Sequence, residues 1–158
     1  MAHEALAIRG HVLLEVTHPD GSTERAEGHN SVVDGGRQMV AQLLAGLLQS
    51  PRFAITAGIS AEETLPDLTK LFDPDGLEPV PVADVTIKDG ILRLRASFPP
   101  ADRERLIKEA GLLLTATHPD TTEVSTLYNR ALVKPHVTVR VKETLTLTWQ
   151  LSFAPQGA

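Results

Sequence analysis

The tetrapeptide Thr-His-Pro-Asp occurs twice in this chain, at residues 17–20 and 117–120. Each copy places an imidazole and a carboxylate two residues apart, and these are the groups that bind metal ions or transfer protons. A metal site, however, needs three or four converging ligands. In both copies a proline separates the two groups inside a polar segment between β-like stretches. Because proline restricts φ and aspartate bonds its neighbouring backbone, we predict that both copies are turns.

The remaining polar groups form no catalytic pattern. Three isolated histidines, interpreted as surface or structural, are His11, His29 and His136. The segment 73–76 begins like a calcium loop, but Glu78 comes too early to be its bidentate ligand. The chain contains no nucleophile elbow, phosphate loop or HExxH motif. A glycosidase-like carboxylate pair needs only proximity in space and stays open. We therefore predict no catalytic, cofactor-binding or metal-binding residue and expect that the chain is not an enzyme.

Length and composition indicate an ordinary globular protein. With 158 residues, of which 42% are apolar and 22% charged, the chain is predicted to form one domain, 1–158, with a real core. Fifteen basic residues against 20 acidic ones argue against binding nucleic acid through its phosphates. The sequence shows no apolar run of membrane-spanning length and no signal-like start, so we expect no membrane association. The absence of cysteine excludes disulfides and thiolate metal sites.

Most of the chain alternates apolar and polar residues, which is typical of β-strands. An N-terminal hairpin is predicted over residues 1–33, and Asp89-Gly90 predicts a second hairpin turn. Further strands are expected at 53–59, 124–133 and 137–153. One apolar face of the last strand comprises Leu145, Leu147, Trp149, Leu151 and Phe153. Trp149 is in phase with that face, so it is predicted to be a core residue rather than a platform for sugars.

One amphipathic helix is predicted, at about 34–49. Its apolar stripe consists of Met39, Val40, Leu43, Leu44, Leu47 and Leu48. Asp34 is the expected N-cap, and Ser50 before Pro51 is the expected end. Residues 101–105 are compatible with a helical turn or with none, and a strand is favoured from Leu106 onward. The predicted class is therefore mainly β: an antiparallel β-sandwich with an N-terminal hairpin and one helix.

Residues 60–82 are predicted to be a long loop. It contains four prolines and no strong periodicity, and loops of this length in compact domains are usually functional or disordered. Within it, Leu68, Leu71 and Phe72 are apolar residues flanked by charge, which suits a small buried patch on a partner. We expect the loop to pack against a neighbouring chain through Leu71 and Phe72.

Four stretches resemble a family of tailed-phage virion proteins of the tail-fibre, tail-collar or baseplate-associated type. They are the hairpin leading into HNSVVDGGRQMVAQLLAG, the strand FAITAGIS, the pair IKEAGLLL and LYNRALVKP, and the ending ETLTLTWQLSF. The pair is similar to the family's "ITEAGLF … LFARAVF", and the ending is similar to "DTLTVTWTITF". The second stretch departs from the family's "HIAVGTG". Together the four stretches span residues 10–153.

The resemblance implies a non-enzymatic structural subunit that works by assembly. Its expected location is the virion, after synthesis in the cytoplasm of the host bacterium. Its expected partners are other copies of itself, with a trimer suggested by the family, and other virion proteins. Two alternatives stay open: a capsid-surface decoration protein, and a carbohydrate- or receptor-binding β-module. An edge strand in a small β-protein offers one route to such assembly, because it can pair with a neighbour.

Overall fold

The computed structural model describes residues 9–153, which form nine β-strands and one α-helix. The elements are β1 (Arg9–Thr17), β2 (Thr23–Val32), α1 (Asp34–Leu44), β3 (Gln49–Gly58), β4 (Val80–Pro81), β5 (Asp84–Lys88), β6 (Ile91–Ser97), β7 (Arg105–Thr117), β8 (Glu123–Val139) and β9 (Thr144–Ser152). The mainly β class predicted from the alternating pattern is confirmed. No helix within residues 9–153 has the length and apolar character that crossing a bilayer requires.

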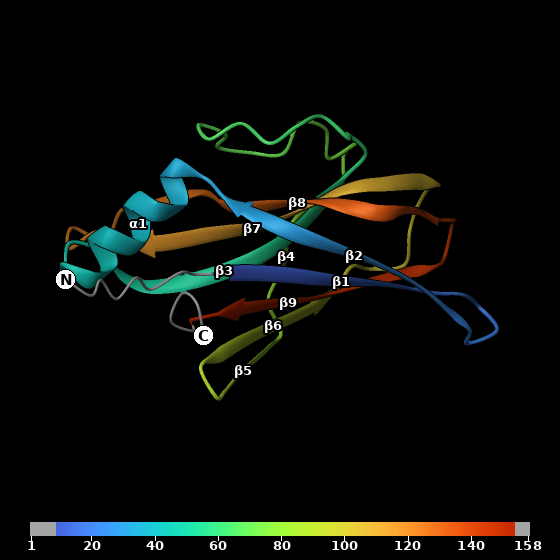
Figure 1. Ribbon diagram of the computed structural model, residues 1–158, viewed down its shortest axis with the longest axis horizontal. Helices are drawn as coiled ribbons and strands as arrows, with labels where there is room; N and C mark the ends of the chain where they lie inside the picture. Colours follow the sequence, from blue (N-terminus) through green and yellow to red (C-terminus); the bar gives the residue numbers. More distant parts are fainter. Residues whose placement is uncertain (1–8, 154–158) are drawn as a thin grey trace, which may run out of the picture.

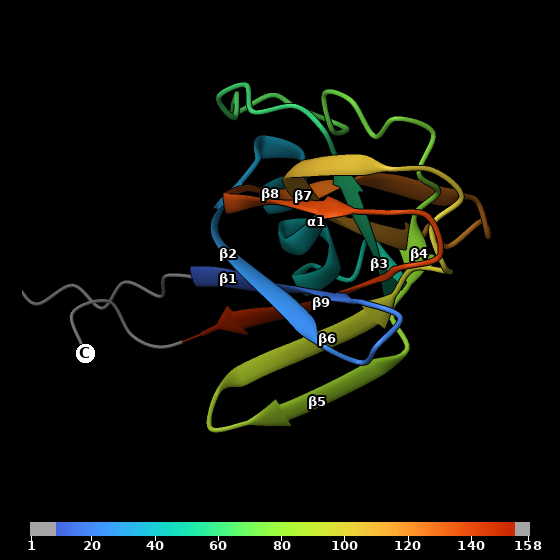
Figure 2. The same ribbon diagram turned by 90° about the vertical axis from the view of Figure 1, so that its right-hand side faces the viewer.

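All nine strands belong to one antiparallel sheet, in the order β4-β3-β7-β8-β2-β1-β9-β6-β5. The sheet curls into a half-barrel, so the two layers of the predicted sandwich are the two halves of one sheet (Figures 1 and 2). The N-terminal hairpin, β1 and β2, lies at the centre of this sheet between β8 and β9. It therefore joins the two halves.

The two ends of the sheet meet where the chain passes from β4 to β5. There the Val82 N–H donates to the Phe53 carbonyl at 3.1 Å, and the Ala83 N–H donates to the Arg95 carbonyl at 3.0 Å. Two consecutive residues thus bond to strands at opposite ends of the sheet. Beyond this point the β5–β6 hairpin leaves the body of the fold (Figure 2). The predicted Asp89-Gly90 turn of that hairpin is confirmed, with φ of 52° and 75°, as a type I′ turn requires.

The core lies inside the curl and receives side chains from both halves. On β9, Leu145, Leu147, Trp149 and Leu151 are all at most 2% exposed, as the alternation predicted. Trp149 lies between Val12 on β1 and Leu94 on β6. Phe153 was predicted to share this face, but β9 ends at Ser152 and the side chain is 39% exposed. That part of the prediction is wrong, because Phe153 lies beyond the end of β9, where the core no longer covers it.

The helix α1 is shorter than predicted. It ends at Leu44, because Gly46 adopts the left-handed conformation (φ 76°) that terminates helices, well before Ser50. Consequently Leu44 and Leu47, expected in the apolar stripe, are 86% and 60% exposed. The rest of the stripe faces the core: Met39 and Leu48 are buried, and Val40 and Leu43 are partly buried.

The start of α1 also differs from the prediction. The N-cap is Val33, in extended conformation and without a side-chain capping bond, whereas Asp34 lies in the first helical turn. There the Asp34 carboxylate accepts a hydrogen bond from Arg37 at 3.2 Å. Its backbone N–H donates to the Pro66 carbonyl at 2.7 Å, so the loop supplies an acceptor for the helix start.

Two strand boundaries were open or misplaced in the sequence. Residues 101–104 form no helical turn, and β7 runs from Arg105, which confirms the favoured interpretation. β8 continues through Pro135 to Val139, although the sequence suggested a break there. The connection to β9 comes instead at residues 140–143. Pro135 is tolerated because it lies where the ladders on both sides of β8 are interrupted. The pairing with β2 ends at Lys134, and the pairing with β7 shifts register between Leu132 and Val137.

Replacing Trp149 by alanine is expected to lower the free energy of unfolding by about 3–5 kcal/mol, because it leaves a large cavity in the core. Circular dichroism in urea measures this without relying on the tryptophan itself. Phe153→Ala is the control, expected to cost less than about 1 kcal/mol at a half-exposed position. A Trp149→Ala protein as stable as the parent would contradict the core assignment.

Candidate functional site

The feature with the most unusual chemistry is the loop of residues 59–79 between β3 and β4. Figure 2 shows it lying over β7 and β8, while α1 lies on the other side of these strands, between the two halves of the sheet. A loop that covers a sheet must satisfy its own backbone polar groups. Here two buried charged side chains, one on β7 and one on β8, do so.

Glu109 on β7 accepts four hydrogen bonds. One comes from the guanidinium of Arg130 on β8 (Nε to Oε1, 3.0 Å), and both side chains are 0% exposed. The other three come from backbone N–H groups of the loop: those of Ser60 (3.0 Å), Phe72 (3.1 Å) and Asp73 (3.2 Å). These donors belong to the beginning and the middle of the loop. A single carboxylate therefore holds together two loop segments that are twelve residues apart.

Arg130 uses its remaining donors on the same loop. Its Nη1 donates to the Glu62 carbonyl at 2.6 Å and to the Thr64 hydroxyl at 2.9 Å, and its Nη2 donates to the Ser60 carbonyl at 3.3 Å. The guanidinium also lies 4.7 Å from the centre of the Phe72 ring, in cation–π geometry. Such extensive hydrogen bonding is the condition under which a buried ion pair is tolerated. We call Glu109, Arg130 and the loop groups that they bind the loop clamp.

Two glycines allow the loop to approach the sheet. A Cβ on Gly58 would lie 2.4 Å from the Asp73 carbonyl oxygen and 2.8 Å from Oε2 of Glu109. A Cβ on Gly111 would lie 2.9–3.0 Å from side chains that include Leu71 and Leu127. Any larger residue at position 58 would push the loop backbone away from Glu109.

Below the loop is a second, smaller apolar cluster. Leu71 is 4% exposed and packs with Val33 and Leu127, and Leu68 packs against the cluster while partly buried. Phe72 is also partly buried, with its ring against the guanidinium of Arg130. Leu71, expected to contact a neighbouring chain, thus has its side chain buried within its own chain. The contact between this loop and a neighbouring chain stays a prediction.

Further along the loop, Asp75 is held by two arginines, one just before β7 and one at its first residue. Arg103 and Arg105 both donate to its backbone carbonyl, and Arg103 Nη2 also lies 3.1 Å from its carboxylate. Arg105 in turn donates to Asp102 at 3.1 Å, and this bond lowers the pKa of Asp102 below its ordinary value of 3.8. Two positively charged guanidinium groups therefore bind Asp75. A calcium loop instead needs its oxygen ligands free to bind a cation.

Both Thr-His-Pro-Asp segments are turns, as predicted, and their geometry is the same. In each, the histidine N–H bonds to the carbonyl four residues on, at 2.9 and 2.8 Å. Asp20 accepts from the N–H and hydroxyl of Ser22, and Asp120 accepts from the same two groups of Thr122. These bonds lower the pKa of both aspartates below the ordinary 3.8. The repeated tetrapeptide builds two equivalent turns.

One of these turns has a partner that the sequence did not reveal. The His18 Nδ1 hydrogen-bonds to the nearly buried carboxylate of Glu143, which also accepts from the Arg140 N–H at 2.7 Å. The bond to Glu143 raises the pKa of His18 above its ordinary 6.5 and lowers the pKa of Glu143 below its ordinary 4.5. Glu24 lies 3.7 Å from the other ring nitrogen. This cluster ties the β1–β2 turn to the β8–β9 connection.

The three histidines that the sequence suggested to be surface or structural stay apart from these groups. His11 and His29 face each other on β1 and β2, with ring centres 5.4 Å apart, and His136 is exposed on β8. Within residues 9–153, no three histidine, aspartate or glutamate side chains are grouped as metal ligands would be.

The sequence did not single out Glu109 or Arg130, although both lie in the stretches that carry the phage-protein resemblance. Glu109 is the E of IKEAGLLL, and Arg130 is the R of LYNRALVKP. A weak signal was present, since each is a charged residue in a strand that is rich in apolar residues, and charged residues are rarely buried unless paired. Comparison of the chain with protein-family models, curated proteins and solved structures finds no match.

Glu109→Gln is expected to destabilise the protein by about 3–5 kcal/mol, because it leaves the Arg130 charge buried without its counter-charge. The amides of Ser60, Phe72 and Asp73 should also exchange faster with deuterium, since their common acceptor is weakened. The matched control is Glu123→Gln, which removes an exposed ion pair with Arg52 (2.6 Å) and should cost less than about 1 kcal/mol. Equal effects of the two substitutions would contradict the role of the clamp.

The His18–Glu143 pair predicts a pH dependence of stability. The raised pKa of His18 stabilises the fold below pH 6.5, and this contribution is lost as the pH rises through the folded value. The lowered pKa of Glu143 contributes above pH 4.5 and is lost as the pH falls through its folded value. The pair should therefore stabilise most between pH 4.5 and 6.5.

The measurement is the free energy of unfolding of His18→Gln and of the parent from acid pH, below 4.5, to alkaline pH. We expect the difference to be largest between pH 4.5 and 6.5 and to shrink at alkaline pH. His118→Gln, at the same position of the twin turn, is the control, because no ion pair joins His118 to a carboxylate within the described residues. A difference that keeps growing as the pH rises above 6.5 would refute the interpretation.

Proposed function

We propose that this protein is a non-enzymatic structural subunit of a tailed bacteriophage virion, associated with the tail, fibre or baseplate. The observation that carries the proposal is the loop clamp. The pair IKEAGLLL and LYNRALVKP, among the stretches that resemble the phage family, supplies its two charged residues, and together they hold a long surface loop in one conformation. A loop ordered in advance loses little conformational entropy when it binds a partner, which suits a protein that works by assembly.

The outward surface of the loop supplies the contact in this proposal. Leu65 is 51% exposed and is the large apolar side chain that this loop turns outward. Around it are exposed charged residues, namely Glu62, Glu63, Asp67 and Lys70. An apolar residue with polar, solvent-accessible groups at its rim is the usual arrangement of a protein–protein contact. Leu65 therefore takes the place that the sequence suggested for Leu71, which lies beneath the loop.

The two open alternatives differ from this proposal in different ways: one in the place of the protein in the particle, the other in the kind of ligand that it binds. A capsid-surface decoration protein is the same proposal at another place in the particle, and immunogold labelling of virions distinguishes the two. A carbohydrate-binding module needs exposed aromatic rings. Trp149, which the sequence predicted to be core rather than a sugar platform, is 0% exposed, so this alternative gains no support from it.

The test is to purify particles from a culture that produces the protein and to measure its copy number by quantitative mass spectrometry. The expected result is a fixed, stoichiometric number of copies per particle. Its absence from intact particles would refute the proposal.

The role of the loop is tested with Leu65→Glu, which places a charge at the proposed contact. Incorporation should fall at least tenfold relative to the parent, because burying an unpaired charge is costly, while the thermal stability of the isolated protein stays the same. Leu47→Glu, at a 60% exposed leucine after α1, is the matched control and should be incorporated normally. Normal incorporation of Leu65→Glu would show that this surface makes no contact.

A further inference from the structure

Within residues 9–153, the strand β5 forms one end of the sheet and pairs only with β6. All five of its residues are exposed, and two are large and apolar: Val85 is 60% exposed and Ile87 is 77% exposed. The β5–β6 hairpin extends from the body of the molecule with β5 outermost (Figures 1 and 2). Its free edge is therefore accessible to another strand.

The backbone groups of that free edge follow from the ladder. The Phe153 N–H donates to the Gly90 carbonyl at 3.0 Å, so Gly90 bonds toward β9. Bonding directions alternate along a strand, so Ile91, Arg93 and Arg95 bond toward β5. Their register partners on β5 are Lys88, Thr86 and Asp84. The N–H and C=O groups of Val85 and Ile87 are left pointing outward, as a ready template for a further strand.

The residues of β5 are complementary to themselves. When the sequence Asp-Val-Thr-Ile-Lys is laid antiparallel to a second copy about its central residue, Thr86 lies opposite Thr86. Val85 then lies opposite Ile87, and Asp84 opposite Lys88, each pair occurring twice by symmetry. In this register the outward N–H and C=O groups of Val85 face those of Ile87 in the other copy, as the hydrogen bonds of an antiparallel ladder require.

We propose that two copies of this chain associate through β5, antiparallel and centred on Thr86, which makes one continuous sheet across a two-fold axis. The partner is a second copy of the same chain. Because the pairing consumes the free β5 edge of both copies, it closes as a dimer. The inference is independent of whether the chain is a virion component.

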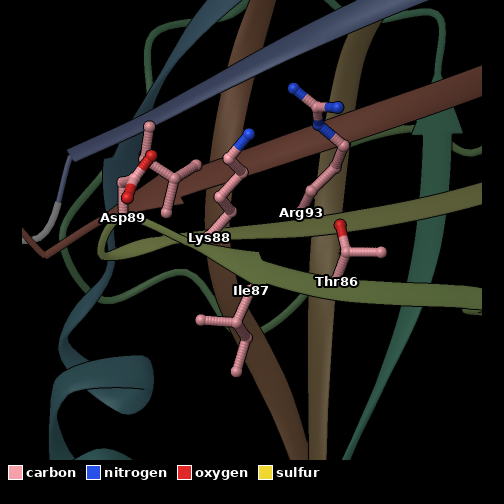
Figure 3. A pocket seen from close by; sticks show the side chains of 6 residues that line it. Thr86, Ile87, Lys88, Asp89 and Arg93 are labelled. Atoms are coloured by element: carbon pink, nitrogen blue, oxygen red, sulfur yellow. The ribbon is translucent and has the colours of Figure 1, made fainter.

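The two faces of β5 suit this pairing. Figure 3 shows Thr86, Lys88 and Arg93 on one side of the hairpin and Ile87 on the other. Asp84, Thr86 and Lys88 would occupy the pairs that lack hydrogen bonds, where side chains are closest, so the opposite charges of Asp84 and Lys88 would meet across the axis. Val85 and Ile87 share the other face with Leu94 and Leu92, which are their register partners on β6.

An apolar hollow lies on that second face. It has a volume of about 410 Å³, and its lining includes Val85, Leu92, Phe53, Pro81 and Val82. In the Thr86-centred register, Ile87 of the second copy would lie opposite Val85, beside this hollow. The pairing would therefore cover exposed apolar surface on both copies.

Charge also selects the register. A slip of two residues in either direction keeps the backbone bonding pattern but places Thr86 opposite Asp84 or Lys88. Both Asp84–Lys88 pairs are then lost. The Thr86-centred arrangement is the one that pairs every residue of β5 with a complementary one.

The first test uses Thr86→Cys in the full chain, which contains no other cysteine. In a pair without hydrogen bonds the two Cα atoms are about 4.5 Å apart, within the range for a disulfide, so mild oxidation should give a covalent dimer. Lys88→Cys is the control. In the same register its two copies lie roughly 13 Å apart along the strands and should stay uncrosslinked.

The second test reverses the charges. Asp84→Lys and Lys88→Asp should each weaken the dimer on the order of tenfold in dissociation constant, since each creates two like-charge pairs. The double variant Asp84→Lys/Lys88→Asp should restore it. Sedimentation equilibrium measures all four proteins, and circular dichroism confirms that each is folded.

Three results would overturn the proposal: a parent protein that stays monomeric at millimolar concentration, an oligomer that Thr86→Cys does not crosslink, and a trimer of the kind the phage resemblance suggests. A dimer with the expected crosslink but without charge rescue would also overturn the register. The presence or absence of the protein in particles decides the proposed function separately.

Discussion

The burial of one ion pair, Glu109 with Arg130, governs the arrangement of the whole loop of residues 59–79. Each side chain is 0% exposed, so each needs a full set of partners, and both find them in the backbone of the loop over β7 and β8. The loop in turn covers the two charges and the apolar cluster around Leu71. Neither part is satisfied without the other. A buried pair of this kind adds little net stability compared with an apolar substitute, but it disfavours every loop conformation that leaves a charge without its partners.

The hydrogen bonds of the loop clamp order a long loop, although loops are usually the least ordered part of a domain. Residues 59–79 contain little regular secondary structure, yet they are fixed by Glu109 and Arg130 at the start and middle and by Arg103 and Arg105 at Asp75. The outward surface of the loop therefore belongs to the rigid part of the molecule. For a protein proposed to work by assembly, such a surface has a clear advantage, since little conformational freedom remains to be lost on binding.

The curl of the sheet sets the second constraint. The sheet nearly closes at residues 82 and 83, where consecutive N–H groups reach strands at opposite ends, and after that point β5 and β6 separate from the body. A fully closed barrel would have no edge. Here closure is confined to one place, and among the described residues it leaves the outer backbone groups of β5 unpaired. The apolar side chains of β5 lie on the same face of the sheet as the core, but no other part of residues 9–153 covers them. The exposed hairpin is thus a direct consequence of the way in which the barrel closes.

The sequence by itself determined what depends on neighbours along the chain. The alternation in β9, the Asp89-Gly90 turn and the two Thr-His-Pro-Asp turns were predictable, because period and turn chemistry act over a few residues. The end of α1 was misplaced because one glycine, Gly46, outweighed the continuing apolar stripe. Tertiary structure alone decided which charges meet: Glu109 and Arg130 are separated by 21 residues, and His18 and Glu143 by 125. Pairing at such distances depends on strand order, bulges and the curl of the sheet, and no local pattern records these, because they are set by the packing of the whole core.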